Sequence, residues 1–399
     1  MLSRLKINHS VSRVLPALIV IVAVASNAFC DTITKVSDRP VFWKIEAAVS
    51  GGPIIGGNSF IKGDNPIGKK ASTSLAGDLR GAFCFNPETP KGMLYKGLYQ
   101  GIGVKRQDFF SRLFGTPWSV YVFQGYPIKH FNSRLWLGYE WEFGVAFDWK
   151  YFKTNTAAVS TSATAHIGLR LNLNQQLSSR WILSYGLGYH HYSNGNTSFA
   201  NNGVNTGGVS VGVSYILNDI IEKTESSDIM EYTADADRKK WIGDILLYGA
   251  WRKRTADVWI NQQIWPGTYA VAGIEGSFLR KFNRWIAAGP AIDLLYDASA
   301  GLDPYWIPGT LGGDIRHSHV PFEKHISAGI SAHCEFSMPI FTINAGVGCD
   351  IVCPVGNGRF FQSLSLKTFI TDFLYLNVGY RLTGFKDSQH LMLGLGVRI

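Results

Sequence analysis

The sequence predicts an all-β protein, an antiparallel transmembrane β-barrel of about 16 strands, and three observations support this prediction. First, only 17% of the 399 residues are charged, whereas 13% are aromatic and 43 are glycine; soluble domains usually carry about 25% charged residues. Second, apolar and polar residues alternate with period two in many segments. Third, beyond the N-terminus there is no apolar run of about 20 residues that could form a membrane-spanning helix.

The segment from Leu135 to Tyr151 shows the alternation most clearly. Its odd positions are apolar or aromatic, and its even positions are small or charged, including Glu140, Glu142 and Asp148. Successive side chains of a strand point to opposite faces, so one face of this strand should be apolar. Every backbone group in lipid must be paired, and period two excludes a helix. A closed barrel is therefore expected.

The same pattern recurs along the chain and gives two sets of about eight candidate strands. A polar segment, residues 219–240, separates the sets, residues 51–71 and 297–324 are expected to be long exposed loops, and no clear internal repeat relates the two halves. One barrel of about sixteen strands is therefore favoured, and two eight-stranded units are the alternative. The candidate strands are 41–50, 73–85, 95–105, 117–126, 135–151, 161–173, 179–193, 205–217, 241–253, 267–281, 284–296, 325–338, 340–351, 361–371, 373–383 and 389–399.

Residues 1–28 have the features of a secretory signal peptide. Arg4, Lys6 and Arg13 form a basic region, an apolar core follows, and residues 26–28 (SNA) form a small-residue cleavage site. A single membrane anchor is the alternative, but the apolar stretch is short and no stop-transfer pattern follows it. Cleavage removes three positive charges, so the formal net charge falls from +9 to +6. The expected location is the outer membrane of a Gram-negative bacterium.

The cysteines and acidic residues give no metal pattern, and no cofactor or metal ion is expected. Cys349 and Cys353 could form a disulfide in an oxidising periplasm, across a small loop. Asp293 and Asp297 could hold calcium, although nothing in the pattern requires it. No nucleotide-binding glycine loop or nucleic-acid motif occurs, so nucleic acid is not an expected partner.

The strand at 179–193 carries the candidate catalytic pair. His191 and Ser193 continue the apolar face formed by alternate residues such as Leu187 and Tyr189, while His190 belongs to the opposite face. The i, i+2 spacing puts the imidazole and the hydroxyl on one side, where the strand leaves the hydrocarbon. Serine is a weak nucleophile that needs an adjacent base, and histidine is the usual one.

The following strand brings a third polar residue to the same face. Asn205 begins it, and the loop 194–204 should place Asn205 within a few residues of the position opposite His191. Asn194 and Asn201, or backbone N–H groups of the loop, are candidates to stabilise an oxyanion. The strand parity therefore places His191, Ser193 and Asn205 on one outer surface.

The region around these residues resembles the lipid A 3-O-deacylase (acyloxyacyl hydrolase-like) outer-membrane family. The likeness covers roughly residues 40–218, where the family motif H-x-S-N is followed by an Asn and then by Gly-x-Glu. It is specific around residues 181–215 and is carried by the stretch GLGYHHYSNGNTSFANNGVNTGGVSVGVSYIL; the segments EWEFGVAFDWKYF and SATAHIGLRLNLN also look like longer relatives of the family.

The resemblance implies that His191 is the base, that Ser193 is the nucleophile, and that Asn201 contributes to the oxyanion site. It also implies that the Glu that orients the His in the family is replaced here by Asn205. In a serine protease, converting the triad carboxylate to an amide lowers kcat about 10⁴-fold. Residues 29–218 are thus expected to form the deacylase-like region, and residues 241–399 to be further barrel strands of unknown role.

Two functions follow from these observations. The leading hypothesis is an outer-membrane serine esterase that removes an acyl chain from lipid A, with lipopolysaccharide and outer-membrane lipids as its partners. The alternative is a porin-like or structural barrel with a degenerate site, suggested by Glu140, Glu142, Asp148 and Arg180, which are expected to face the lumen.

Overall fold

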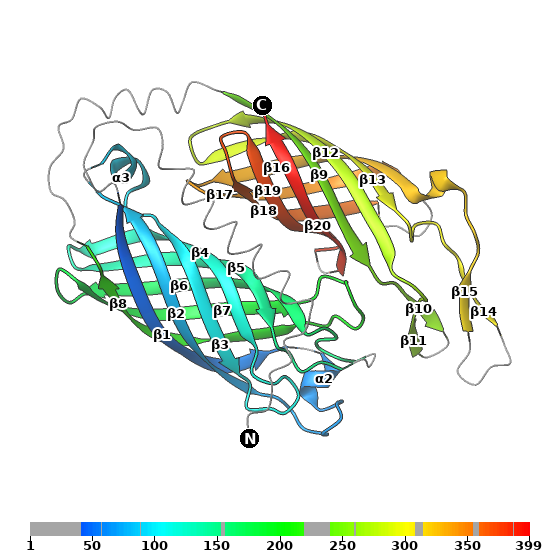
Figure 1. Cartoon of the computed structure of the whole chain (residues 1–399), viewed down its shortest axis with the longest axis horizontal. Helices are drawn as coiled ribbons and strands as arrows, with labels where there is room; N and C mark the ends of the chain where they lie inside the picture. Colours follow the sequence, from blue (N-terminus) through cyan, green and yellow to red (C-terminus); the bar gives the residue numbers. More distant parts are fainter. Residues whose placement is uncertain are drawn as a thin grey trace, which may run out of the picture. The chain divides into compact units, whose positions relative to one another are not determined.

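The computed structural model describes residues 41–56, 58–87, 89–152, 156–218, 240–258, 261–307, 314–353, 359–385 and 387–399. Within these residues, sixteen long strands form two closed antiparallel barrels of eight strands each (Figure 1). The predicted signal peptide, Cys30 and almost all of the polar segment 219–240 lie outside the described residues.

The first barrel closes through pairing of its first and last strands. Consecutive strands are hydrogen-bonded neighbours, and β1 also pairs with β8, from Lys44 opposite Ile216 to Ile55 opposite Asn205. The strands are β1 (Val41–Ile55), β2 (Thr73–Phe85), β3 (Tyr99–Asp108), β4 (Trp118–Asn132), β5 (Leu135–Phe147), β6 (Ala163–Gln176), β7 (Trp181–Ser193) and β8 (Val204–Ile216).

The second barrel closes through β20 and β9. Its strands are β9 (Trp241–Arg252), β12 (Tyr269–Lys281), β13 (Ile286–Asp297), β16 (Ile326–Ser337), β17 (Phe341–Val352), β18 (Phe360–Phe369), β19 (Leu374–Thr383) and β20 (Asp387–Arg398). The smaller elements of the chain are α2 (Ser59–Lys62), α3 (Pro90–Tyr95), η1 (Phe322–His325) and the two-stranded sheets β10 (Thr255–Val258) with β11 (Asn261–Ile264) and β14 (Pro304–Ile307) with β15 (Asp314–His317).

The strand count is confirmed, but the strands adopt the alternative arrangement of two eight-stranded units. A single barrel of about sixteen strands does not form, because β8 returns to β1 and the first sheet closes on itself before residue 218. A closed sheet has no free edge with which β9 could pair. The predicted loop 51–71 is also shorter than expected, since β1 continues to Ile55 and α2 follows.

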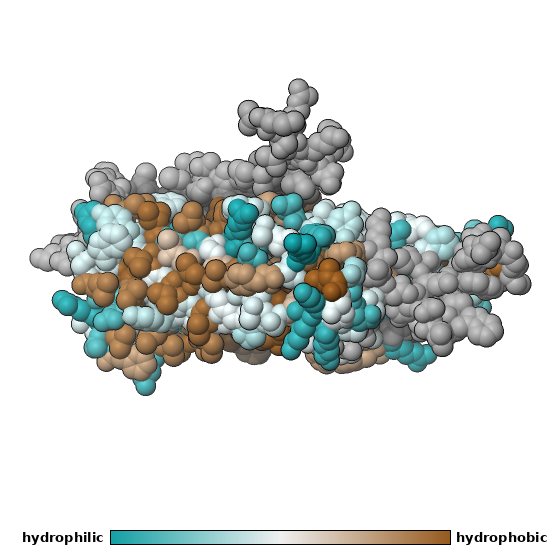
Figure 2. All heavy atoms as spheres, turned by 90° about the horizontal axis from the view of Figure 1, so that it is seen from below, coloured by the Kyte–Doolittle hydropathy of each residue, from teal (hydrophilic) through white to brown (hydrophobic). Residues whose placement is uncertain are grey.

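Apolar side chains cover the outside of both barrels. In β7, Tyr185, Leu187 and Tyr189 are exposed, whereas Ser184 and His190 are buried. Figure 2 shows such apolar residues gathered in broad patches over the visible face. An exposed apolar surface of this extent on a closed barrel is the pattern of a β-barrel that spans a membrane.

Among the described residues, no helix is long and apolar enough to cross a membrane. The suggested disulfide between Cys349 and Cys353 is not formed.

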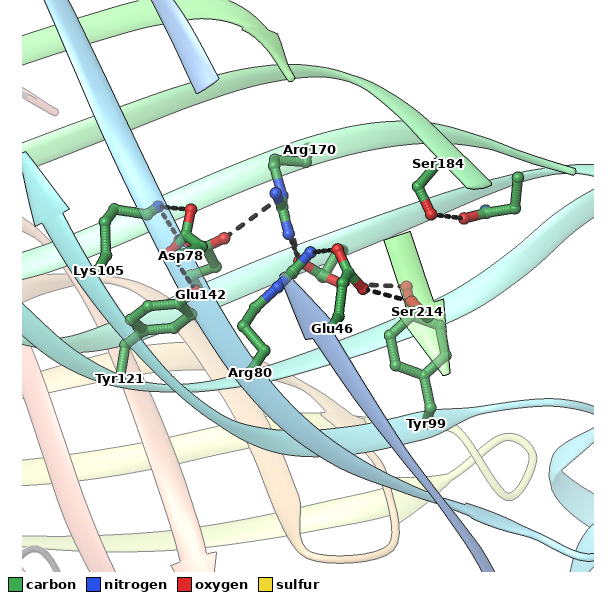
Figure 3. Close-up of polar contacts among 12 residues, drawn as sticks. Glu46, Asp78, Arg80, Tyr99, Lys105, Tyr121, Glu142, Arg170, Ser184 and Ser214 are labelled. Carbon is green, nitrogen blue, oxygen red and sulfur yellow. Dashed lines mark hydrogen bonds and ion pairs between the residues drawn. The ribbon is translucent and has the colours of Figure 1, made fainter. Parts of the chain in front are cut away.

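Charged and polar side chains fill the lumen of the first barrel (Figure 3). Arg80 forms ion pairs with Glu46 and Glu140, and Arg170 forms a second ion pair with Glu140. Ser214 donates a hydrogen bond of 3.0 Å to Glu46. Because buried charges are costly unless paired, these contacts explain how four strands tolerate ionised groups in their inner faces.

A second group of lumen residues surrounds Lys105. Its Nζ lies 2.8 Å from Oε2 of Glu142 and 3.8 Å from Oδ2 of Asp78, and the Tyr121 hydroxyl donates to Asp78 at 2.7 Å (Figure 3). Tyr121 requires a glycine beside it, since a Cβ on Gly103 would lie 2.5 Å from the Tyr121 hydroxyl. The small residues at alternate positions therefore make room for the large polar ones.

Loops at one end of the first barrel pack into an apolar cluster above the lumen. Trp149 is buried there, whereas Asp148 is exposed with a φ of 68°. The prediction that Asp148 faces the lumen was wrong, because β5 ends at Phe147 and the alternation of the sequence no longer describes a strand. Arg180 was also misplaced: it lies in the β6–β7 turn, and its Nη1 is 3.3 Å from the Tyr215 hydroxyl. The buried members of the cluster are Ile54, Phe60, Ile61, Ala71, Phe109, Leu113, Phe114, Ala146, Trp149, Ala157, Ala158, Val159, Tyr192, Ala200 and Val204.

Candidate active site

The predicted catalytic residues lie at the end of β7 that leads into loop 194–203. His191 and Ser193 are both half-buried, on the same outer face as Leu187 and Tyr189. In the sheet, His191 stands opposite Ile167 of β6 on one side and opposite Asn205 of β8 on the other. The predicted register, with Asn205 near the position opposite His191, is therefore confirmed.

A short hydrogen bond links His191 to Asn205. Their Nδ1 and Oδ1 atoms are 2.6 Å apart. An amide oxygen can only accept, so Nδ1 carries the proton in this contact and Nε2 has a lone pair directed away from Asn205. Gly203 lies beside the ring with a φ of 70°, and a Cβ there would be 3.1 Å from Cε1 of His191. The arrangement fixes the orientation and the tautomer that a general base requires.

Ser193 is placed by backbone pairing with Ala165 of β6. Among the described residues its hydroxyl makes no hydrogen bond to the His191 ring. Catalytic hydrogen bonds are often long without substrate and tighten when it binds, so this geometry is compatible with a nucleophile–base pair. The side chains share one face at i, i+2, as predicted.

The two asparagines of the loop hold each other and the loop. The Asn194 backbone N–H donates to Oδ1 of Asn201 at 2.8 Å. The Asn194 side chain is buried, and its Nδ2 donates to Oγ of Ser160 at 2.9 Å and to the Ser198 carbonyl at 3.0 Å. The Asn194 side chain is thus engaged with Ser160 and Ser198, and Asn201 is bound to the residue that follows Ser193.

Lumen contacts on the other face of β7 anchor the strand behind the site. Nδ1 of His190 lies 3.3 Å from Nζ of Lys105 and 3.3 Å from Nε2 of His166. The Tyr192 hydroxyl donates to Gln107 at 2.7 Å, and its ring stacks on His166 with centroids 4.8 Å apart. The residues on either side of His191, His190 and Tyr192, are therefore held by contacts inside the barrel.

These anchoring residues were not singled out from the sequence. His190 was assigned to the lumen side by parity, but its partners come from three other strands and no spacing connects them. The only signal that could have found them is the set of polar residues at inward positions of β3, β5 and β6.

Comparisons with known proteins bear on both barrels. Residues 123–214 match the family model described as lipid A 3-O-deacylase (PagL), and residues 242–399 match the model described as acyloxyacyl hydrolase, C-terminal domain. The first match includes His191, Ser193 and Asn205. Among curated proteins, none matches the chain.

Several solved structures are similar to this chain at low scores. Neisserial surface protein A (NspA) is 12% identical with a TM-score of 0.28, and the aligned region covers 44% of this chain and 97% of the NspA chain. CdiB from Escherichia coli is 11% identical with a TM-score of 0.21, covering 92% and 64%. The translocator domain of the autotransporter NalP from Neisseria meningitidis is 11% identical with a TM-score of 0.17, covering 98% and 96%.

Proposed function

This chain belongs to the lipid A 3-O-deacylase family, and from that membership we propose that its first barrel is a serine esterase that hydrolyses an acyl ester of lipid A. The protein is an outer-membrane ester hydrolase, and its substrate class is the acylated glycolipid of that membrane. The observation that carries the mechanism is the 2.6 Å contact between His191 and Asn205 on the lipid-facing side of β7 and β8, two residues from Ser193.

In the proposed reaction, Nε2 of His191 takes the Ser193 hydroxyl proton as Oγ attacks the ester carbonyl. The bond from carbonyl carbon to sugar oxygen then breaks, and the imidazolium gives its proton to the departing sugar oxygen, which leaves as a hydroxyl. Water, deprotonated by the same imidazole, attacks the acyl-serine, and the imidazolium returns the proton to Oγ of Ser193 as the fatty acid is released. Asn205 holds the ring in the tautomer that this cycle needs.

The surface beside the site suits an acyl chain. Leu187, Tyr189 and Val209 are exposed next to His191 and Asn205, and Ile55 of β1 stands opposite Asn205 on the other side. A lipid packed along this stripe would bring an ester near the membrane interface to the level of Ser193. Substrate therefore reaches the serine laterally from the membrane.

The loop asparagines receive different roles in this proposal. Asn201 is the candidate oxyanion donor of the loop. Asn194 positions that loop, because its side chain donates to Ser160 and to the Ser198 carbonyl. Backbone N–H groups of the loop are the other donors that could stabilise the tetrahedral intermediate.

The neutral Asn205 is expected to make the enzyme slow. It accepts a hydrogen bond from Nδ1, as a carboxylate would, but it adds no negative charge to stabilise the imidazolium. In a serine protease, the change from carboxylate to amide lowers kcat about 10⁴-fold, and this value sets the scale of the loss expected here. A low rate is tolerable for an enzyme that modifies a membrane component already present at high local concentration.

The porin-like alternative has little structural support. The lumen of the first barrel is occupied by Arg80, Glu140, Arg170 and Lys105 with their partners. A barrel of about eight strands has an interior that side chains just fill. An open aqueous path through this barrel is therefore not expected.

Mass spectrometry of lipid A from cells with and without the protein tests the proposal. We expect a lipid A species that lacks one acyl chain when the wild-type chain is present, and its loss with Ser193→Ala. Ser184→Ala is the matched control, because Ser184 lies on the same strand but faces the lumen and donates to Asn174. An acylation pattern that is unchanged by the wild-type protein would contradict the proposal.

A further inference from the structure

The second barrel has more buried carboxylates than buried cations to pair with them. Its described residues include six carboxylates that are at most 5% exposed: Asp244, Glu275, Asp293, Asp297, Glu335 and Asp350. Four cations lie within ion-pair distance of carboxylates in this set, namely Arg252, Lys367, Arg381 and Arg398. The lumen therefore holds two more buried carboxyl groups than cations that pair with them.

Lys367 and Arg398 together neutralise two of the carboxylates. Nζ of Lys367 lies 2.7 Å from Asp244 and 2.5 Å from Glu335, and Nη2 of Arg398 lies 2.7 Å from each of the same two residues. This group is balanced, with two positive and two negative charges in contact.

Two further cations are also committed to carboxylates. Arg252 lies 2.9 Å from Asp297, and Nη2 of Arg381 lies 2.5 Å from Asp350. Arg381 approaches Asp293 only at 4.0 Å, through its other terminal nitrogen. Glu275 and Asp293 are therefore the carboxylates that no Lys or Arg in the described part of the barrel neutralises closely.

Glu275 and Asp293 converge with His333. The three residues come from the adjacent strands β12, β13 and β16, and each offers a ligand atom within 4.8 Å of the others. Glu275 is 3% exposed, yet its carboxylate accepts no hydrogen bond from any described residue. Nδ1 of His333 lies 3.7 Å from its Oε1. A buried carboxylate without a donor is costly unless another charge compensates for it.

We propose that Glu275, Asp293 and His333 bind a divalent transition-metal ion inside the second barrel. Such an ion supplies the two positive charges that the lumen lacks. One imidazole nitrogen with two carboxylates suits Zn²⁺ or Mn²⁺, whereas Ca²⁺ prefers oxygen ligands alone. The site is separate from the esterase residues, and the proposal does not depend on the proposed esterase activity.

The surroundings of His333 match the outer shell of a metal site. Oδ1 of Asn344 lies 3.0 Å from Nδ1, and because an amide oxygen can only accept, Nδ1 carries the proton in this contact when no metal is bound. A metal ion at Nδ1 would replace that proton, and Oγ of Ser331, 3.0 Å from Nε2, could then accept the N–H of the other nitrogen. Ser331 also approaches Asp293, at 3.5 Å.

The first barrel contains a similar cluster that is already filled. Glu142, His166 and His190 also place ligand atoms within 4.8 Å of one another. There, however, the Lys105 ammonium lies 2.8 Å from Glu142 and 3.3 Å from His190. A metal ion would have to displace or deprotonate this lysine. The contrast identifies Glu275, Asp293 and His333 as the cluster that still needs a cation.

Metal analysis of the full chain, produced without a histidine tag and purified in detergent without chelator, tests the proposal. We expect about one ion per chain, captured as the barrel folds around it. After EDTA treatment, addition of ZnCl₂ or MnCl₂ should raise the melting temperature by several degrees. A metal content near zero together with an unchanged melting temperature in both salts would overturn the proposal.

Two variants decide whether these residues form the site. Glu275→Gln and Asp293→Asn keep the shape of the side chain, and each should lose the bound ion and the shift in melting temperature. Without metal, Glu275→Gln should melt higher than wild type, because it removes an uncompensated charge. Ser277→Ala, two residues away on β12 and also buried, should keep the ion. Metal content unchanged in both carboxylate variants would overturn the assignment.

Discussion

Nδ1 of His191 lies 2.6 Å from Oδ1 of Asn205, directly across the β7–β8 pair. The contact joins the end of one strand to the beginning of the next, on either side of the loop that contains Asn194 and Asn201. The pairing of β7 with β8 therefore fixes the orientation of the candidate base. The register between β7 and β8 therefore assembles the site.

Replacing Asn205 with Asp should accelerate deacylation. Asp has nearly the same shape, accepts the same N–H and adds the negative charge that stabilises an imidazolium. We expect kcat to rise by about tenfold or more, a fraction of the effect seen when a triad carboxylate is removed. The rate of fatty-acid release from purified lipid A in detergent measures it.

Asn205→Leu is the matched control for that prediction. It preserves the volume and removes the hydrogen bond, so kcat should fall below the wild-type value. Equal activity of the Leu, Asn and Asp chains would mean that the His191–Asn205 contact has no catalytic role.

Substitutions of the two neighbouring histidines of β7 should have different effects, one on kcat and the other on stability. His191→Gln removes the base, and we expect kcat to fall by about 10³-fold or more while the folded fraction is unchanged. His190→Gln alters contacts with Lys105 and His166 in the lumen, so it should lower stability and leave kcat of the folded protein nearly unchanged. Paired measurements of kcat and melting temperature separate the two; a larger loss of kcat in His190→Gln would refute the assignment.

Arg80→Met should destabilise the first barrel strongly. The change leaves Glu46 and Glu140 buried without their shared cation, and breaking such a buried pair typically costs about 3–5 kcal/mol. Arg134→Met, at an exposed turn, should change the free energy of unfolding by less than about 0.5 kcal/mol. Urea unfolding in phospholipid vesicles compares them, and similar values for both would argue against a structural role for the lumen ion pairs.

Leu187→Arg should report the depth of β7 in the membrane. Leu187 is the central residue of the strand and is 62% exposed on the outer face. An arginine at the bilayer midplane costs about 2–4 kcal/mol, falling to about 0–1 kcal/mol near the interface. Leu217→Arg, just beyond the end of β8, should therefore be nearly neutral. Equal free energies of unfolding for the two variants in vesicles would place β7 outside the hydrocarbon.

Period-two alternation was sufficient to locate the sixteen barrel strands and to assign faces to most of their side chains, but it missed the short sheets β10–β11 and β14–β15. It placed His191, Ser193 and Asn205 on one surface, because parity depends only on the position of each residue within a strand. It misplaced Asp148 and Arg180, because the alternation in the sequence extends past the end of β5 and begins before the start of β7. Strand ends depend on loop packing, such as that around Trp149.

The division into two barrels could not be predicted from such local patterns. Whether β8 pairs with β1 or with β9 depends on a contact between residues far apart in sequence, such as Lys44 and Ile216. The cluster of Glu275, Asp293 and His333 was missed for the same reason, because its three members come from three strands. Asp293 was noticed only beside Asp297, which the structure pairs with Arg252.

His190 and His191 are consecutive residues that lie in different media, one among protein charges and the other beside lipid. A one-residue slip of β7 against its neighbours would exchange them, turning the polar face of the strand to the membrane and its aromatic face to the ion pairs. Such an inside-out strand would leave Glu142 and Lys105 facing tyrosine and leucine. The lumen charges thus disfavour the slipped register, because it would leave buried charges without partners and turn the face that carries His191 and Ser193 away from the membrane.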